Sequence, residues 1–300
     1  MTMAIEIDSN DMSFSYNPGT PVLDSINLNI SGPQLVSILG PNGVGKSTLI
    51  HCFNKILSPS KGTVLLDSKD VDDYSLKEMA KNVGYVPYSS SDTFPLTVVD
   101  AVLLGRHPHA GWKTTDEDLE IVYDTLGKMG IEDLAMRSFN ELSAGQHQKV
   151  MLARGLVQKP RALLLDEPTS NLDVKHQLAI SKMLRDLSRQ EGILVIMISH
   201  DINIAAKYSD NIILMRDRTI YAVGRPSDVI TEENIFNIYG VRCKIVDDQG
   251  RPHLILEGPE DDGHSAFCDG STCEGQSHHK KDYSGVGKGP HDSRIVEQKG

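Results

Sequence analysis

The chain has 300 residues, of which 39% are hydrophobic and 24% are charged, and its formal net charge is −11. The apolar fraction is sufficient for a folded core, whereas the negative balance argues against a nucleic-acid-binding protein that relies on a broad positive field. Four scattered cysteines argue against a disulfide framework. No uncharged apolar run is long enough to cross a bilayer, so we expect membrane contact only through a partner.

The first elements are predicted to be two antiparallel strands. Hydrophobic residues recur with a period close to two at 5–16 and again at 23–30, which is typical of half-exposed strands. The residues between these segments include Asn17, Pro18 and Gly19, which favour a turn.

The next segment fits the pattern G-x-x-x-x-G-K-[ST]. It reads Gly40-Pro41-Asn42-Gly43-Val44-Gly45-Lys46-Ser47-Thr48, between an apolar strand at 35–39 and a helical turn at 49–53, which is the context that the pattern requires. Glycines let backbone N–H groups curl around a polyphosphate, and the helix N-terminus faces the same phosphates. Lys46 would add a cation for the β- and γ-phosphates, and Ser47 a hydroxyl for Mg²⁺. We therefore predict that the chain binds a nucleoside triphosphate.

Strands and helices alternate along the rest of the chain. Strands are predicted at 63–66, 83–87, 161–166, 193–198 and 211–215, and helices at 76–80, 146–157, 174–189 and 203–208. Two of the strands are apolar over 162–165 and 193–198, as in a parallel sheet buried on both faces. From 98 to 158 the spacing is helical. We therefore predict an α/β fold with a right-handed parallel sheet and an inserted helical subdomain.

Two acidic residues stand at the carboxyl end of the strand at 161–166. Asp166 is placed to hold Mg²⁺ together with Ser47. Glu167 is placed to orient and deprotonate a water molecule for attack on the γ-phosphate. The alternative is a pair of helix-capping acids before Pro168.

Four further features resemble those of one family. The segment Leu142-Ser143-Ala144-Gly145-Gln146 resembles the Leu-Ser-Gly-Gly-Gln signature of ATP-binding-cassette (ABC) proteins, with alanine at its third position. His200 matches the switch histidine of these ATPases, and 170–173 resembles their loop after the acidic strand. Tyr16 matches the N-terminal aromatic residue that stacks on adenine. Together and in this order, the motifs resemble those of ABC-transporter ATPase subunits.

The resemblance implies a P-loop (RecA-like) ABC ATPase core with an N-terminal antiparallel β-subdomain, in a domain of residues 1–257 whose inserted helical subdomain lies at about 95–158. It also implies a head-to-tail homodimer with two ATP molecules at the interface. Each ATP is held by the phosphate loop of one subunit and the signature segment of the other. The implied catalytic residues are Glu167 and His200, and the implied Mg²⁺ ligands are Ser47 and Asp166. The implied ATP contacts are Tyr16, Gly40, Pro41, Asn42, Gly43, Val44, Gly45, Lys46, Ser47, Thr48, Ser143, Ala144, Gly145, Gln146 and Asp173.

Two segments narrow the resemblance to one group of transporters. Residues 94–106 and 224–231 look like those of importers of iron-siderophore, haem and cobalamin type. This implies integral-membrane permease subunits as partners, an extracytoplasmic substrate-binding protein as an indirect partner, no nucleic acid, and a peripheral location at the cytoplasmic face of the cell membrane. One position departs from the family: Tyr88 follows Val86-Pro87 where a glutamine is usual, and our hypothesis is that Tyr88 slows hydrolysis.

Other interpretations stay open at this point. The chain also suits a soluble cassette ATPase that acts on nucleic acid or ribosomes, an exporter subunit, or a nucleotide-binding regulatory module that turns over slowly or not at all. Residues 258–300 have a composition typical of a disordered polar tail. The tail contains possible metal ligands, which are Cys268, Cys273, His264, His278, His279 and His291, although their spacing matches no strong zinc pattern.

Overall fold

The computed structural model describes residues 5–88, 95–109 and 114–259. The expected tail from 258 onward, with its cysteines and histidines, lies outside the described residues apart from its first two positions. Within the described part of the chain, no helix is both long and apolar enough to span a membrane. Both cysteines in this part, Cys52 and Cys243, are buried and unpaired.

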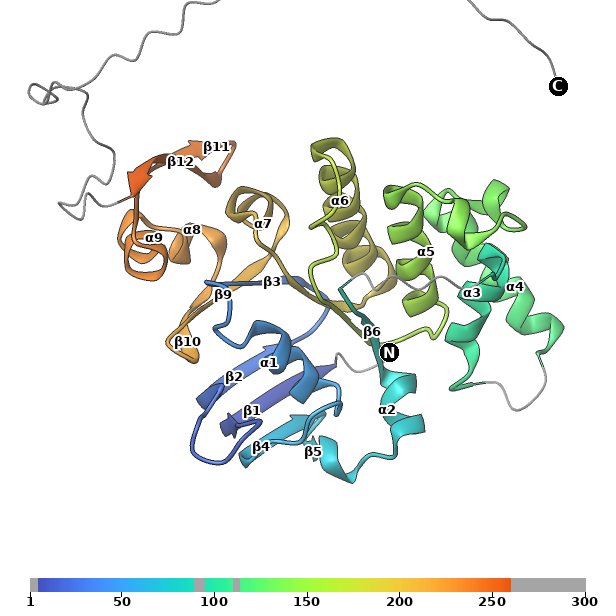
Figure 1. Ribbon diagram of the computed structural model, residues 1–300, viewed down its shortest axis with the longest axis horizontal. Coiled ribbons are helices and arrows are strands. Elements are labelled where there is room, and N and C mark those ends of the chain that lie inside the picture. The colour runs from blue at the N-terminus through green and yellow to red at the C-terminus, as the bar shows by residue number, and fades with distance from the viewer. Residues whose placement is uncertain (1–4, 89–94, 110–113, 260–300) are drawn as a thin grey trace, which may run out of the picture. The chain divides into compact units, whose positions relative to one another are not determined.

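A six-stranded sheet forms the centre of the fold (Figure 1). Its strands lie in the order β10 (Thr219–Gly224), β9 (Asn211–Arg216), β3 (Leu35–Leu39), β8 (Leu194–Ile198), β7 (Ala162–Leu165) and β6 (Val83–Val86). Neighbouring strands from β9 to β6 are parallel, and β10 pairs antiparallel with β9 at one edge. Every residue of β3, β7 and β8 is buried. The predicted α/β fold is therefore confirmed.

The two faces of this sheet belong to different hydrophobic cores, which explains why its central strands are apolar throughout. Leu163 and Leu165 pack into one core together with helices α5 (Ala144–Leu156) and α6 (Val174–Glu191). Leu164, which points to the other face, packs into a second core with helix α1 (Lys46–Phe53). Alternate side chains of one strand thus bury against different layers.

The first predicted strands form a separate antiparallel sheet below α1 (Figure 1). Its order is β2 (Leu23–Ser31), β1 (Glu6–Phe14), β4 (Lys61–Leu66) and β5 (Lys69–Asp70). Ile7 and Met12 of β1 and Ile26 of β2 are almost completely buried, and they join the core that contains α1. The short turn η1 (Val71–Asp73) and helix α2 (Leu76–Asn82) then lead into β6.

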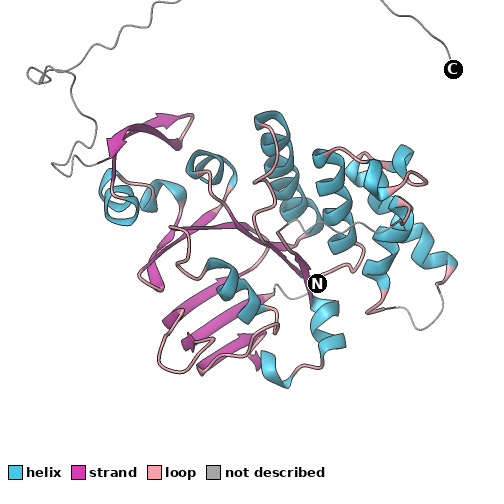
Figure 2. Cartoon of the chain, in the orientation of Figure 1, coloured by secondary structure: helices cyan, strands magenta, loops and turns pink. Residues whose placement is uncertain are grey.

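Short and long helices gather beside one end of the large sheet (Figure 2). They are α3 (Val98–Leu103), η2 (Leu104–Arg106), α4 (Asp116–Met129), η3 (Glu132–Leu134), η4 (Phe139–Glu141) and α5. The guanidinium of Arg106 joins three of them. Its Nε donates to Asp118 of α4 at 2.8 Å, and its NH1 donates to the carbonyl oxygen of Val157, just after α5, at 2.7 Å. This buried ion pair fixes the inserted helices to one another.

The C-terminal part contains elements that the sequence analysis did not predict. After α7 (Ile202–Tyr208) and the β9–β10 hairpin come α8 (Pro226–Val229) and α9 (Glu232–Tyr239). They are followed by a hairpin of β11 (Val241–Asp248) and β12 (Arg251–Pro259). In β12, Gly258 and Pro259 still pair with β11, so regular structure continues two residues beyond the expected domain end at 257.

We predict that Arg106→Ala lowers the free energy of unfolding by about 3 kcal/mol, because it leaves the carboxylate of Asp118 buried without its cation. Arg137→Ala is the matched control, since its pair with Glu141 is exposed and 3.6 Å long, and it should cost less than about 1 kcal/mol. Urea unfolding of both variants measures the difference. Equal losses for the two variants would contradict the structural role of Arg106.

Candidate functional site

The phosphate loop is shaped by close packing at two of its glycines. A Cβ atom at Gly40 would lie 2.5 Å from the backbone oxygen of Met215 in β9, and one at Gly45 would lie 2.7 Å from the side chain of Leu23 in β2. Both glycines also have positive φ angles, 154° and 104°. Any side chain at either position would displace the neighbouring strand, so the loop needs glycine for packing as well as for conformation.

Lys46 reaches back into the loop that precedes it. Its Nζ donates hydrogen bonds to the backbone oxygens of Gly40 at 2.8 Å and Pro41 at 2.9 Å. Burial lowers the pKa of this ammonium, although the charges of Glu167 and Asp166 act in the opposite direction. Helix α1 begins here with Gly45 as its N-cap and without a side-chain cap, so its first backbone N–H groups remain available to an anion.

Ser47 and Asp166 come together although they are far apart in the sequence. The hydroxyl of Ser47 donates to Oδ1 of Asp166 at 3.1 Å, and only 7% of Asp166 is exposed. Burial raises the pKa of this carboxyl, as does the nearby charge of Glu167, whereas the bond from Ser47 lowers it. A hydroxyl and a carboxylate are oxygen ligands of the kind that Mg²⁺ takes, so the pair fits this ion.

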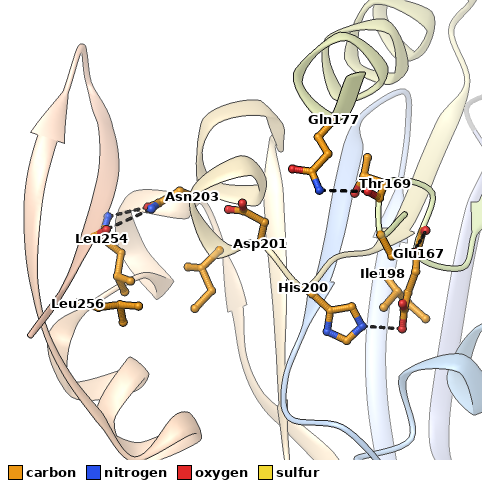
Figure 3. Close-up of a pocket in the computed structure, with 11 residues that line it drawn as sticks. Glu167, Thr169, Gln177, Ile198, His200, Asp201, Asn203, Leu254 and Leu256 are labelled. Carbon is orange, nitrogen blue, oxygen red and sulfur yellow. Dashed lines mark hydrogen bonds and ion pairs between the residues drawn. The ribbon is translucent and has the colours of Figure 1, made fainter. Parts of the chain in front are cut away.

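Glu167 and His200 form the second contact of the site. Nε2 of His200 lies 2.5 Å from Oε1 of Glu167, as Figure 3 shows. Glu167 has a φ of 50°, a left-handed conformation that non-glycine residues rarely adopt. The unusual backbone directs the side chain of Glu167 toward His200, at the carboxyl ends of β7 and β8.

Lys46, Ser47, Glu167 and His200 line an open cleft of about 560 Å³. The cleft is lined by Val22, Asn42, Gly43, Gly45, Lys46, Ser47, Thr48, Tyr88, Glu167 and His200. A Cβ atom at Gly43 would meet no other atom within 4 Å, so the backbone there is open toward solvent. The predicted Tyr16 stands at the edge of the same region: its hydroxyl lies 3.4 Å from Oγ1 of Thr48, and 61% of the residue is exposed. An exposed ring beside the loop suits a stacking contact with a base.

Tyr88 is tied to the loop that follows Glu167. Its hydroxyl accepts a hydrogen bond of 3.3 Å from Nδ2 of Asn171. Tyr88 also lines the cleft, where 47% of it is exposed. Sequence reasoning singled out Tyr88 as a departure but did not predict its contact with Asn171, because nothing in the local pattern joins positions 88 and 171.

The predicted signature segment forms the start of α5. The hydroxyl of Ser143 accepts from the backbone N–H of Gln146 at 3.3 Å, and the side chain of Gln146 accepts from the backbone N–H of Ser143 at 3.0 Å, which makes a capping box. The residues that line the cleft do not include Ser143–Gln146, nor do they include Asp173, the N-cap of α6. The predicted site residues therefore fall into two separate groups in one copy of the chain.

A second cavity of about 500 Å³ adjoins Glu167 and His200 (Figure 3). The C-terminal hairpin forms its other side through Leu254 and Leu256. Asn203 of α7 fixes this hairpin, because its amide donates to the Leu254 oxygen at 3.1 Å and accepts from the Leu254 N–H at 2.7 Å. The alternating apolar residues of β11 and β12, with the turn residues at 247–250 between them, are the signal that would have predicted this hairpin.

We predict that Asp166→Asn stabilises the nucleotide-free protein at neutral pH. Burial raises the pKa of Asp166 above its ordinary value, so this carboxyl costs free energy in the fold at pH values above its ordinary pKa, and the full cost is present above the raised pKa. Asparagine keeps an oxygen for the Ser47 hydroxyl without the charge. The melting temperature should rise by about 2–4 °C at pH 7.5, and the gain should shrink as the pH falls through the raised pKa toward the ordinary pKa of the carboxyl.

The matched control for this prediction is Asp173→Asn. Hydrogen bonds from the backbone and then the side chain of His176 lower the pKa of Asp173, so its charge stabilises the fold above its ordinary pKa. This variant should gain no stability at pH 7.5. Thermal unfolding from pH 5 to pH 8 measures both variants, and a loss of stability in Asp166→Asn across that range would contradict the inferred cost of its charge.

Comparisons with known proteins identify the family of the chain. The family model for ABC transporters matches residues 23–170. An uncharacterised ABC transporter ATP-binding protein of Methanocaldococcus jannaschii is 45% identical over 256 residues, which cover 85% of this chain and 99% of that protein. The ferric enterobactin transport ATP-binding protein FepC of Escherichia coli is 36% identical over 243 residues, covering 79% and 89% of the two chains. A bacterial ABC transporter cassette solved as a dimer has a TM-score of 0.65 and 30% identity, covering 73% of this chain and 98% of its own. The chain belongs to the ATP-binding subunits of ABC transporters, whose family activity is ATP hydrolysis.

Proposed function

We propose that the chain powers the import of a metal chelate of iron-siderophore, haem or cobalamin type through a membrane permease. The observation that carries this proposal is the cleft lined by the phosphate loop and by the Glu167–His200 pair, in which Ser47 is hydrogen-bonded to Asp166. Similarity to a ferric enterobactin transport protein supports the class of cargo. The cargo itself would be recognised by the permease and the substrate-binding protein, since this cleft serves the nucleotide.

In this function each group of the cleft has a distinct task. The backbone of the loop and Lys46 bind the phosphates of ATP, and Tyr16 stacks on its base. Ser47 and Asp166 hold Mg²⁺, which neutralises phosphate charge when it is bound. Glu167 orients and deprotonates the attacking water, and His200, which already contacts Glu167, fixes that side chain and meets the γ-phosphate.

The second group of residues completes the site in a dimer. Ser143–Gln146 and Asp173 stand apart from the cleft of their own chain, so in a head-to-tail dimer they would serve the ATP bound to the other copy. Similarity to a cassette solved as a dimer supports this arrangement. The dimer would attach to permease subunits at the cytoplasmic face of the membrane and would respond through them to a substrate-binding protein.

Tyr88 favours a second candidate, a nucleotide-binding module that turns over slowly or not at all. Its phenol replaces the amide side chain that is usual in the family and is already bonded to Asn171. A cassette acting on nucleic acid or ribosomes gains no support, because the net charge of −11 provides no broad positive field.

Glu167→Gln separates an ATPase from a binding module. We expect ATP hydrolysis by the purified protein with its permease to fall at least about 100-fold, because the amide does not accept the proton of water, while ATP binding persists. Glu233→Gln, an exposed residue of α9, is the control and should retain the wild-type rate. A wild-type protein without measurable turnover would favour the binding module, and an unchanged rate in Glu167→Gln would refute the proposed role of Glu167.

Tyr88→Gln tests the departure from the family. We expect the hydrolysis rate with the permease present to rise about threefold to tenfold, since glutamine adds a carbonyl oxygen that the phenol lacks, and 1.4 kcal/mol in the barrier corresponds to tenfold. Tyr88→Phe removes the bond to Asn171 without adding a carbonyl, so it should not raise the rate. No increase, or a loss, in Tyr88→Gln would show that Tyr88 does not limit hydrolysis.

A further inference from the structure

His176 lies in the first turn of α6, three residues after Asp173. Oδ1 of Asp173 accepts two hydrogen bonds from it, one from the backbone N–H at 2.9 Å and one from ring Nδ1 at 2.8 Å. Because a carboxylate only accepts, the proton of the neutral ring lies on Nδ1. The N-cap of α6 thus fixes the orientation of the imidazole.

The other edge of this ring rests against the signature segment. A Cβ atom at Gly145 would lie 2.7 Å from Cδ2 and 3.1 Å from Nε2 of His176. Gly145 belongs to helix α5 and is not among the positive-φ glycines, so its conformation is one that any residue adopts. The ring of His176 therefore gives a steric reason for glycine at position 145, since it occupies the space of a side chain.

Gln177, the next residue, contacts the loop that follows Glu167. Nε2 of Gln177 donates to the backbone oxygen of Thr169 at 3.1 Å, and Thr169 is a buried residue only two positions after Glu167. One helical turn therefore contacts the backbone of the signature segment through His176 and the loop after Glu167 through Gln177. His176 itself is not among the residues that line the cleft of its own chain.

We propose that His176 is a positioning residue that sets the backbone of Ser143–Gln146, and with it the γ-phosphate site that each copy offers to the other. This role rests on the proposed head-to-tail dimer. Asp173 holds the ring, and the ring supports Gly145. A contact within one copy therefore sets the position of the signature segment, which binds the ATP of the partner copy. His176 does not touch the nucleotide of its own chain.

The test compares binding by one copy with assembly of two copies. In a Glu167→Gln background, which retains bound ATP, we measure the affinity for MANT-ATP and the ATP concentration that gives half-maximal dimer in analytical ultracentrifugation. His176→Ala should leave the MANT-ATP affinity within about twofold and raise the half-maximal ATP concentration about tenfold, which corresponds to 1.4 kcal/mol. Lys182→Ala, an exposed residue on the same helix, should match the background in both measurements.

Two further variants separate the ring contact from the helix cap. His176→Asn keeps a donor near Asp173 but has no ring against Gly145, so it should behave like His176→Ala. Gly145→Ala should impair assembly while His176 is present, and adding His176→Ala should relieve part of that loss, because the new methyl group then has room. Should either His176 variant fail to fold in thermal unfolding, the other variant and the Gly145→Ala pair carry the test.

Each negative outcome has a different meaning. A Glu167→Gln protein that stays monomeric with ATP would refute the proposed dimer. A background that dimerises while His176→Ala dimerises equally well would refute the role of His176. Normal assembly of His176→Asn together with impaired assembly of His176→Ala would reduce His176 to a helix-capping residue, and would also overturn the proposal.

Discussion

The structure depends on the fixed backbone of the phosphate loop, which packs against strands of two sheets. Gly40 lies against the backbone oxygen of Met215 in the large sheet, and Gly45 lies against Leu23 in the antiparallel sheet. The backbone N–H of Asp24 donates a hydrogen bond of 2.9 Å to the backbone oxygen of Arg218, which joins the same two sheets nearby. The glycines of this loop have no side chains to brace it, so its shape comes from these neighbours and from the hydrogen bonds of Lys46 to the oxygens of Gly40 and Pro41.

Two charged side chains beside this loop are buried, which costs free energy. Lys46 and Asp166 are both nearly inaccessible to solvent. Burial lowers the pKa of Lys46 and raises the pKa of Asp166, so it favours the neutral form of each. Among the residues that the structure describes, neither forms an ion pair: Lys46 donates hydrogen bonds to backbone oxygens, and Asp166 accepts one from a hydroxyl. A bound triphosphate and cation would supply the missing opposite charges, so a site that is costly in the empty protein is well suited to its ligand.

The sequence predicts most of the fold and the composition of the site, because the signals are local. Glycine spacing predicts the phosphate loop at 40–48, and unbroken apolar runs predict the strands at 162–165 and 193–198. What joins distant segments leaves no local pattern: the bond from Asn171 to Tyr88, the packing of His176 on Gly145, and the clamp of Asn203 on Leu254 each depend on the three-dimensional arrangement. The C-terminal hairpin is different, because alternating apolar residues mark both of its strands in the sequence itself.

The contacts of Tyr88 and His176 suggest how such a cassette is controlled. Both residues contact the segment 167–173 that follows β7, Tyr88 through Asn171 and His176, in the first turn of α6, through Asp173. Glu167 stands at the start of this segment, in a left-handed conformation that only the surrounding structure maintains. In the proposed head-to-tail dimer, a shift of this segment would move Glu167 in one nucleotide site and, through His176, the signature segment that completes the other. Because residues 167–173 contact groups of both nucleotide sites, the two sites of such a dimer would be coupled. A substitution at either end of this segment would then change ATP binding or hydrolysis at both sites.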